Sequence, residues 1–254
     1  MNWLREHIPT FVAVAIILVT WEVWIRLSAV SAQLVPAPSS VARAMIAALP
    51  TLAPASLVTT LEGIVGFAIA IVLGILTGVA LYCSHTANRA LFPLLYAAQT
   101  MPLITIAPLF LIWFGFEMRG KIVIVALFAM FPIAVQTIRG LTAIPGFYAD
   151  VALTSGATPT WTLWHVKLRV AARQIFGGIK VSAAYVFATA ATAEYLGARD
   201  GLGVWLQQAY NSFQTSLIFA ATAVIIILTA VLMAGVNLAE RALLGPADDE
   251  DLDQ

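Results

Sequence analysis

Charged side chains are scarce in this sequence, and their scarcity excludes an ordinary water-soluble protein. Only 10% of the 254 residues are Asp, Glu, Lys or Arg, whereas 61% are hydrophobic. A soluble domain has about 25% charged and about 45–50% apolar residues. The apolar side chains therefore exceed what one aqueous core could hold, and a lipid bilayer is the solvent that this composition favours. The 13 basic and 13 acidic residues cancel, so the net charge does not indicate nucleic-acid binding.

Cysteines and catalytic motifs are also scarce or missing. The single cysteine, Cys83, excludes a disulfide within the chain and a cysteine-bound metal cluster. His7, His85 and His165 lack the spacing of metal ligands, and we expect them at the surface. The sequence has no P-loop, no Gly-x-Ser-x-Gly and no His-Glu-x-x-His. We therefore expect no catalytic residue, no metal and no cofactor in this chain.

The sequence is instead rich in long apolar runs. A helix needs roughly 20 mostly apolar residues to cross a bilayer. The candidate spans are about Ile8–Leu27, Leu57–Tyr82, Leu91–Phe116, Ile122–Ile138, Ile175–Leu196 and Leu217–Leu238. The predicted fold class is an all-α membrane protein with about six transmembrane helices.

The first candidate span allows two interpretations. It could be a signal peptide, because "AVSAQ" (residues 29–33) offers small residues suited to cleavage. We favour an uncleaved helix, because the apolar run continues beyond the length that a signal peptide needs. In addition, Glu22 and Arg26 stand one helical turn apart, where they can form a pair.

Prolines and small residues predict how the other spans behave. The third candidate is interrupted by Pro93, Pro102 and Pro108 and should be kinked or partly unwound. The fourth is short and carries Pro132. The second and fifth have small-residue faces, formed by Gly63, Gly66, Gly74 and Gly78 and by the alanine-rich run 182–193. Small faces let helices approach closely in lipid, so we expect a packed bundle.

The distribution of Lys and Arg predicts cytoplasmic termini. In that orientation the inner segments hold Arg5, Arg89, Arg139, Lys167, Arg169, Arg173 and Arg241, and the outer segments hold Arg26, Arg43, Arg119, Lys121 and Arg199. We divide the chain into an N-terminal helix with a periplasmic segment (1–56), a core (57–242) with a cytoplasmic loop at about 144–173, and an acidic tail (243–254) that we expect to be solvated.

The segment from Ile144 to Arg173 is too polar to span the membrane and too patterned for a slack linker. Its two halves have the length of short helices, separated by Gly156, Ala157 and Thr158. In the second half, Trp161, Trp164 and Leu168 share one helical face. The segment could be an anchor in the headgroup zone. Alternatively, the small residues at the bend could clear a surface that fits a partner.

The same residues carry a resemblance to a known family. "DVALTSGATPTWTLWHVKL" resembles the cytoplasmic signature loop of ATP-binding-cassette (ABC) importer permeases, which reads Glu-Ala-Ala, three residues, Gly, nine residues, then Ile-x-Leu-Pro. The spacing and Gly156 are kept, but Asp150, Val151 and Arg169 depart from the pattern. "QTMPLITIAPLFLIWFGF", "FPIAVQTIRGL" and "AEYLGARDGLGVWL" are similar to permeases of the nitrate, sulfonate, taurine and pyrimidine-precursor importers. "SFQT" followed by "IFAA" leans toward the thiamine pyrimidine precursor.

The resemblance implies a type I importer permease in the bacterial inner membrane. Such permeases dimerise with a second copy, receive solute from a periplasmic or lipid-anchored binding protein, and rest on two cytoplasmic ATPase subunits that bind ATP and Mg. The signature loop would be the coupling helix, with Asp150, Ala152, Gly156, Ala157, Thr158, Trp161 and Leu168 as its expected coupling residues.

We further expect Trp161 and Trp164 to fix this loop against the spans. Asp150 would either pair with the ATPase or cap a short helix, and Lys167, Arg169 and Arg173 would hold anionic headgroups.

Polar residues within the spans are the candidates for the substrate path. Helix breaks near the middle of the membrane often bind substrate, and the expected residues are Gln99, Thr100, Met101, Pro102, Gln136, Thr137 and Glu194. Pro102 could equally serve only to kink its span, with Gln99 bonded to a neighbouring helix. Glu194 could be a gate, a contact for the binding protein or a partner of Arg199. Glu62 and Lys180 need not meet each other.

The apolar composition also fits two other classes of membrane protein. An ion-coupled secondary transporter is the first alternative, but no internal repeat is evident. A membrane-embedded enzyme is the second, and the missing catalytic motifs count against it.

Overall fold

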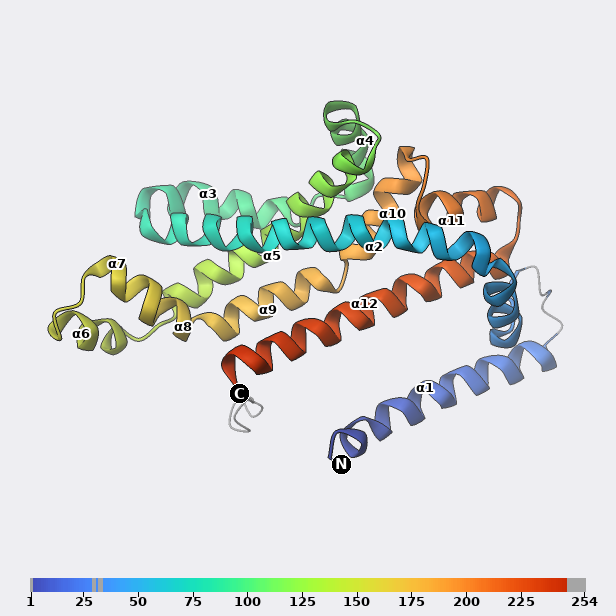
Figure 1. Ribbon diagram of the computed structural model, residues 1–254, viewed down its shortest axis with the longest axis horizontal. Helices are drawn as coiled ribbons and strands as arrows, with labels where there is room; N and C mark the ends of the chain where they lie inside the picture. Colours follow the sequence, from blue (N-terminus) through green and yellow to red (C-terminus); the bar gives the residue numbers. More distant parts are fainter. Residues whose placement is uncertain (1, 29–30, 32–33, 246–254) are drawn as a thin grey trace.

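The computed structural model describes residues 2–28, 31 and 34–245, and every element in these ranges is a helix (Figure 1). In chain order they are α1 (Asn2–Leu27), α2 (Pro38–Cys83), α3 (His85–Ala98), α4 (Leu103–Phe114), α5 (Met118–Thr142), α6 (Gly146–Thr154), α7 (Pro159–Thr162), the π-helical turn η1 (Leu163–Lys167), α8 (Leu168–Val170), α9 (Ala172–Ala183), α10 (Val186–Gly197), α11 (Leu202–Asn211) and α12 (Thr215–Leu244). The acidic run at 248–253 lies outside the described residues.

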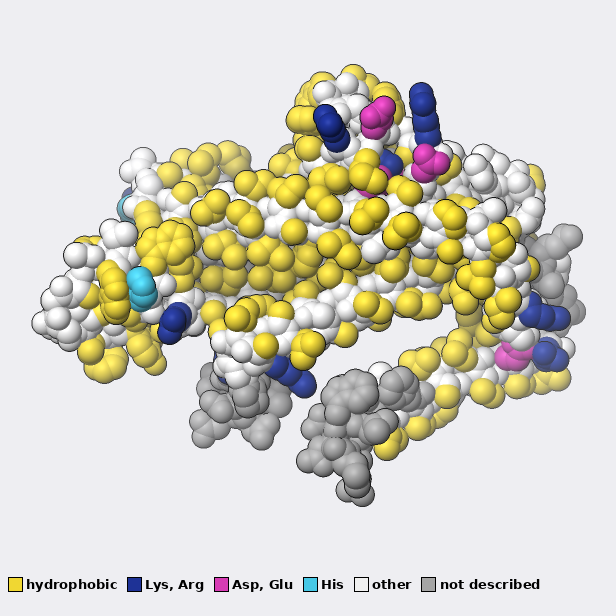
Figure 2. Space-filling model, viewed as in Figure 1, with side chains coloured by type: hydrophobic (Ala, Val, Ile, Leu, Met, Phe, Trp, Pro, Cys, Tyr) yellow, Lys and Arg dark blue, Asp and Glu magenta, His cyan; other side chains and the backbone are white. Residues whose placement is uncertain are grey.

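The predicted membrane fold is confirmed. Five stretches of the described chain are long and apolar enough to cross a bilayer: Ile8–Leu27, Pro38–Cys83, Met118–Thr142, Ala172–Gly197 and Thr215–Leu244. A sixth arises if α3 and α4, which meet at 105°, form one broken span. Figure 2 shows hydrophobic side chains covering most of the long middle surface, with charged side chains gathered near helix ends.

The second span is longer than the sequence indicated. We expected it to begin at Leu57, but α2 begins at Pro38 and runs unbroken through Pro50 and Pro54. A proline removes one backbone hydrogen bond and kinks a helix without having to end it, and the α2 ribbon bends in its N-terminal part (Figure 1). The expected boundary at residue 56 therefore falls inside one continuous helix.

The glycine face of α2 packs as predicted. Gly63, Gly66, Gly74 and Gly78 are buried. A methyl group added to any of them would lie only 2.5–2.7 Å from a side chain of α5 or α10. The alanine-rich face is confirmed as well, since Ala183, Ala190 and Ala193 are fully buried. Small residues thus let the backbones of α2, α5 and α10 approach closely.

Two spans are interrupted, and only one interruption was predicted. The third breaks at residues 99–102, where Pro102 immediately precedes α4, while Pro93 and Pro108 lie within helices. The fifth also breaks, between α9 and α10 at residues 184–185. Close to this second break, the Ser182 hydroxyl donates to the carbonyl oxygen of Ala129 on α5, at 2.7 Å. No proline or glycine marks the second break in the sequence.

Three ion pairs involve charged residues of the spans. The predicted Glu22–Arg26 pair is confirmed at 2.7 Å. Glu62 and Lys180 do not meet: Glu62 binds Lys121 and Lys180 binds Glu240, each pair at 2.5 Å. Lys121 was expected in an outer segment but is only 3% exposed, because it lies in the first turn of α5 and its ammonium binds Glu62.

The helices place two groups of segments at opposite ends of the molecule. Figure 1 shows α6, α7 and α8 at one end of the long axis, with the C-terminal end of α12 toward that end. The N-terminal part of α2 and α11 lie at the opposite end. The long helices α2 and α5, which pack along each other, connect the two ends.

Candidate functional site

The segment that follows α5 folds into the two short helices that the sequence predicted. The first is α6, from Gly146 to Thr154. The second begins as α7 at Pro159 and continues through the π-helical turn η1 into α8, which ends at Val170. We call residues 146–170 the loop helices.

Hydrogen bonds define the turn between the loop helices. Gly156 has φ +89°, a conformation that costs an L-residue about 1–2 kcal/mol. Its N–H donates to the Leu153 carbonyl and the Ala157 N–H to the Ala152 carbonyl, both at 3.0 Å. These two bonds form a Schellman motif, which ends a helix at a left-handed residue. The backbone itself therefore requires Gly156, a reason that the sequence analysis did not give.

The next two residues start the second helix. The Thr158 hydroxyl accepts the Trp161 N–H at 3.2 Å, which is an N-cap bond, and Pro159 occupies the first helical position, where a missing N–H costs nothing. A C-cap and an N-cap thus meet within three residues. The turn is compact and rigid for this reason.

The loop helices enclose an open groove of about 730 Å³. Five of the expected coupling residues line it: Ala152, Gly156, Ala157, Thr158 and Trp161. The rest of the lining is mainly apolar, and the aromatic side chains in it are well exposed, Phe147 by 70% and Trp161 by 48%. A methyl group added at Gly156 would meet nothing within 4 Å. The groove and the turn therefore present an accessible apolar surface.

The other two expected coupling residues lie outside the groove. Asp150 is exposed in the middle of α6, which has no side-chain cap, so the capping alternative for this residue is wrong. Leu168 packs against the hydrophobic core.

Different residues from those expected attach the loop helices to the spans. Leu163 and Leu168 contact the core cluster, whereas Trp164 remains 48% exposed and Trp161 stacks on His165 at 4.5 Å. The expectation that the tryptophans are the anchors is therefore wrong. Lys167, which we assigned to lipid headgroups, donates to the Tyr82 hydroxyl at 2.9 Å and lies over the Tyr82 ring.

The expected substrate-path residues fall into three environments. Gln99, Thr100, Met101 and Pro102 form the exposed break between α3 and α4. Gln136 accepts a hydrogen bond from Gln174 of α9 at 2.9 Å. Thr137 is fully buried against Gly78 of α2 and donates to its own helix.

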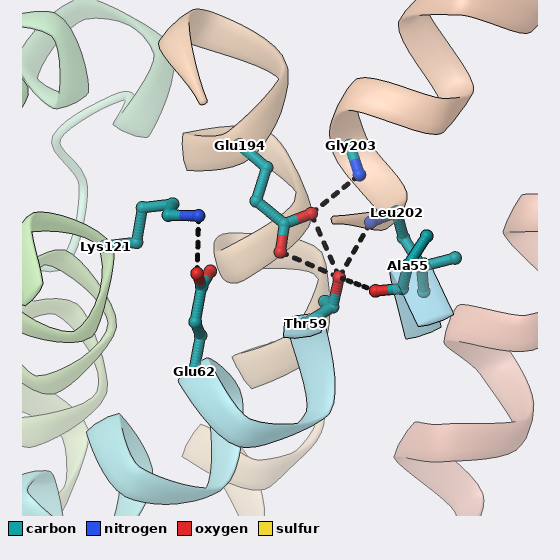
Figure 3. Close-up of polar contacts among 7 residues, drawn as sticks. All are labelled: Ala55, Thr59, Glu62, Lys121, Glu194, Leu202 and Gly203. Carbon is teal, nitrogen blue, oxygen red and sulfur yellow. Dashed lines mark hydrogen bonds and ion pairs between the residues drawn. The ribbon is translucent and has the colours of Figure 1, made fainter. Parts of the chain in front are cut away.

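Glu194 has the third environment, and it is a buried one. Glu194 is only 1% exposed. It accepts hydrogen bonds from the Thr59 hydroxyl, at 2.7 and 3.0 Å, and from the Gly203 N–H, at 2.7 Å (Figure 3). Burial excludes Glu194 as a direct contact for a binding protein. Its bonding partners are Thr59 and Gly203, neither of which was singled out from the sequence.

No cluster of His, Cys, Asp or Glu in the described residues could hold a metal ion. His85 and His165 are exposed as expected, and the side chain of His7 lies outside the described residues.

Residues 70–244, more than half of the chain, match the family described as "Binding-protein-dependent transport system inner membrane component". The chain belongs to this family. It is the permease component of a binding-protein-dependent ABC importer, a multi-pass inner-membrane protein without an ATPase site. This result rules out the ion-coupled secondary transporter.

Two curated relatives cover nearly the whole chain. The formylaminopyrimidine transport permease protein ThiX of Halalkalibacterium halodurans is 30% identical over 90% of this chain and 91% of its own length. The riboflavin transport system permease protein RibX of Chloroflexus aurantiacus is 31% identical over 96% of this chain and 91% of its own. The taurine transport system permease protein TauC of Escherichia coli is 29% identical over 68% of this chain and 63% of its own.

A solved structure shows the same fold. A chain of the MetNI methionine ABC transporter, in an inward-facing conformation, matches with a TM-score of 0.67 at 19% identity. The match covers 77% of this permease and 97% of that chain.

Proposed function

We propose that the loop helices are the coupling element of this permease and dock on a cytoplasmic ATPase subunit. The observation that carries the proposal is the capped turn at Gly156, which holds two short helices rigidly around an open apolar groove. A rigid element transmits a displacement, whereas a slack loop absorbs it. Exposed aromatic side chains such as Phe147 and Trp161 are the kind of residue that dominates protein interfaces.

A second copy of the permease completes the translocation path in this proposal, along the break at residues 99–102. A helix break leaves backbone groups without intrahelical partners. Such groups cannot face lipid at low cost, so a break at membrane depth must lie against protein or a water-filled cavity. Because these four residues are exposed in the single chain, the second copy and the path would lie on this side. Gln99 and Thr100 then offer polar contacts to a solute.

The solute that we propose is a small nitrogen heterocycle, the pyrimidine precursor of thiamine. The alternative is an acyclic solute such as a sulfonate, taurine or nitrate. The relatives named for formylaminopyrimidine and riboflavin transport are 30% and 31% identical over at least 90% of this chain. Two relatives named for aliphatic sulfonate transport cover as much of it at a lower identity, 28% and 26%, and the taurine relative covers less of it. A binding screen of the cognate binding protein against these compounds tests the choice. Binding of taurine or nitrate in preference to the heterocycles contradicts it.

The coupling role is tested with Gly156→Trp. A bulky side chain there would project outward, since the position is open, and would obstruct docking. We expect uptake in cells to fall about tenfold or more, as when an interface hot spot is disrupted, while the permease still assembles in the membrane.

The matched control for this variant is Gly245→Trp. Gly245 also has a left-handed backbone, with φ +79°, and open space around it, but it lies at the end of α12. The control carries the same kind of backbone strain without touching the loop helices. Normal uptake in Gly156→Trp removes the coupling role, and an equal loss in Gly245→Trp shows that strain alone explains the effect.

A further inference from the structure

The start of α11 is capped by side chains from other helices. Gly201, which precedes α11, has φ +114° and no side chain with which to cap it. The Leu202 N–H donates instead to the Thr59 hydroxyl of α2, at 2.8 Å, and the Gly203 N–H to the Glu194 carboxylate of α10, at 2.7 Å (Figure 3). Two of the orphan donors at the helix start are therefore satisfied by side chains from two other helices, α2 and α10.

The Glu194 carboxylate suits this place because the N-terminus of a helix is its positive end. The Thr59 hydroxyl links the two caps, since it accepts from Leu202 and contacts both oxygens of Glu194. Thr59 is fully buried. Removing its hydroxyl would leave a buried N–H without an acceptor, which costs far more than an exposed hydrogen bond contributes.

A second buried contact lies one turn along α2. Glu62, on the same face as Thr59, binds Lys121 of α5 at 2.5 Å, and both side chains are almost completely buried. Thr59 and Glu62 together tie α2 to α5, α10 and α11. Four buried side chains, Thr59, Glu62, Lys121 and Glu194, make these connections.

The backbone at the start of α11 lies close to α10. A methyl group on Gly201 would lie 2.2 Å from the Glu194 carboxyl carbon, and one on Gly203 would lie 2.0 Å from the Ala191 carbonyl oxygen. Neither position has room for a side chain. The two glycines therefore allow α11 to pack closely against α10.

The other end of α2 contacts the loop helices. Tyr82, in the last turn of α2, accepts the hydrogen bond of Lys167 from η1. Thr59 lies 23 positions before Tyr82, which corresponds to about 35 Å of helix at about 1.5 Å per residue. Figure 1 shows α2 running between these two ends of the molecule.

We propose that α2 carries displacements of the loop helices to α11, and that Thr59 and Glu194 are positioning residues that fix α11 to it. The proposal rests on the coupling role of the loop helices. It adds that the far end of the permease responds to the ATPase through this particular helix and its two polar attachments.

The test measures each end of α2 separately in the assembled importer, reconstituted in liposomes. In a Cys83→Ser background, one cysteine is introduced at Ser155 in the loop turn or at Gln208 on α11, both exposed, and is spin-labelled. Distances between the labels of the two copies are measured before and after addition of ATP and vanadate. ATP hydrolysis by the same importer is measured with and without the purified cognate binding protein.

In Thr59→Val we expect the Ser155 distance to change as in the parent, while the change at Gln208 is lost. Stimulation of hydrolysis by the binding protein should fall about tenfold, the scale of one buried unsatisfied group. Thr59→Ser keeps the hydroxyl and should restore both readouts. Thr60→Val is the matched control, because the Thr60 hydroxyl bonds only to its own helix, and it should behave as the parent does.

Three results would overturn the proposal. The first is a parent-like change at Gln208 in Thr59→Val. The second is an equal loss in Thr60→Val. The third is no change at Ser155 in the parent, which refutes the coupling role and the inference with it.

If Thr59→Val does not assemble, the same distance measurements on Tyr82→Phe test the proposal instead. This variant keeps the ring beneath Lys167 but removes the acceptor, and loss of the Gln208 change supports the proposal while its persistence refutes it.

Discussion

Two acidic residues, Glu22 and Glu194, bind the first turn of a neighbouring helix. Glu22 accepts the backbone N–H and the hydroxyl of Ser39 at the start of α2, much as Glu194 accepts the N–H of Gly203 at the start of α11. A carboxylate in lipid costs about 2.5 kcal/mol or more. Helix N-termini supply the donors and the positive potential that offset this cost.

Phe213 gives a prediction at the scale of one residue. It has φ +54° and is 89% exposed, and it follows α11 at the place where a left-handed glycine usually ends a helix. Phe213→Gly should raise the free energy of unfolding by about 0.5–1 kcal/mol by relieving this strain. Thermal unfolding of the purified permease in detergent measures it.

Phe213→Ala is the control for that prediction, because it removes the ring but keeps the left-handed backbone strained. It should give no gain. A gain of equal size in Phe213→Ala would show that the exposed ring, rather than the backbone, is the source of the instability.

The sequence predicted some single-residue features and not others. The Glu22–Arg26 pair follows from spacing within one helix, so it was predictable. The partners of Glu62, Lys180 and Glu194 lie on other helices, 59, 60 and 135 positions away in the sequence, and spacing within one helix contains no information about them. The role of Gly156 was also missed, because a glycine in a turn can serve either backbone conformation or surface access.

At the scale of elements, the glycine face of α2 determines how the bundle packs. Gly66→Leu would place a side chain where Val125 of α5 already lies, since even a methyl group would be 2.6 Å from it. We expect a loss of at least about 1–3 kcal/mol of stability from overpacking, measured as a lower unfolding temperature in detergent.

Gly235→Leu provides the control for this prediction. Gly235 lies in α12 with nothing within 4 Å of an added methyl group, so the same substitution there should leave the unfolding temperature nearly unchanged. Leu has a higher helix propensity than Gly, so equal losses in both variants would mean that a large side chain destabilises the protein wherever it is added, and not through the contact with α5.

Elements were predictable where a long apolar run, a proline or a bend of small residues marks them in the sequence. The broken third span was predicted because Pro102 lies inside it, and the two loop helices because a bend of small residues separates them. The break between α9 and α10 was not predicted: no proline or glycine marks it, and contacts with other helices such as Ser182 to α5 accompany it. The early start of α2, at Pro38 and ahead of Pro50 and Pro54, was not predicted.

At the scale of the whole molecule, the proposed solute path follows the exposed break between α3 and α4. There we predict that Gln99→Ala raises the substrate concentration for half-maximal uptake about three- to tenfold, the effect of one lost hydrogen bond. Assembly with the ATPase should be unchanged. Uptake kinetics in proteoliposomes measure the effect.

Asn88→Ala, in the first turn of the same broken span, is the control and should leave uptake kinetics as they are. An unchanged half-maximal concentration in Gln99→Ala would place the solute path elsewhere in the assembly.

The same break has a consequence for the life of the protein in the cell. In the proposed assembly, a newly inserted copy that has not yet met its counterpart would expose the backbone of this break to lipid, where unpaired polar groups are costly. A lone copy would therefore be less stable in the membrane than a paired one, and the folding of the permease would be completed only when two copies meet.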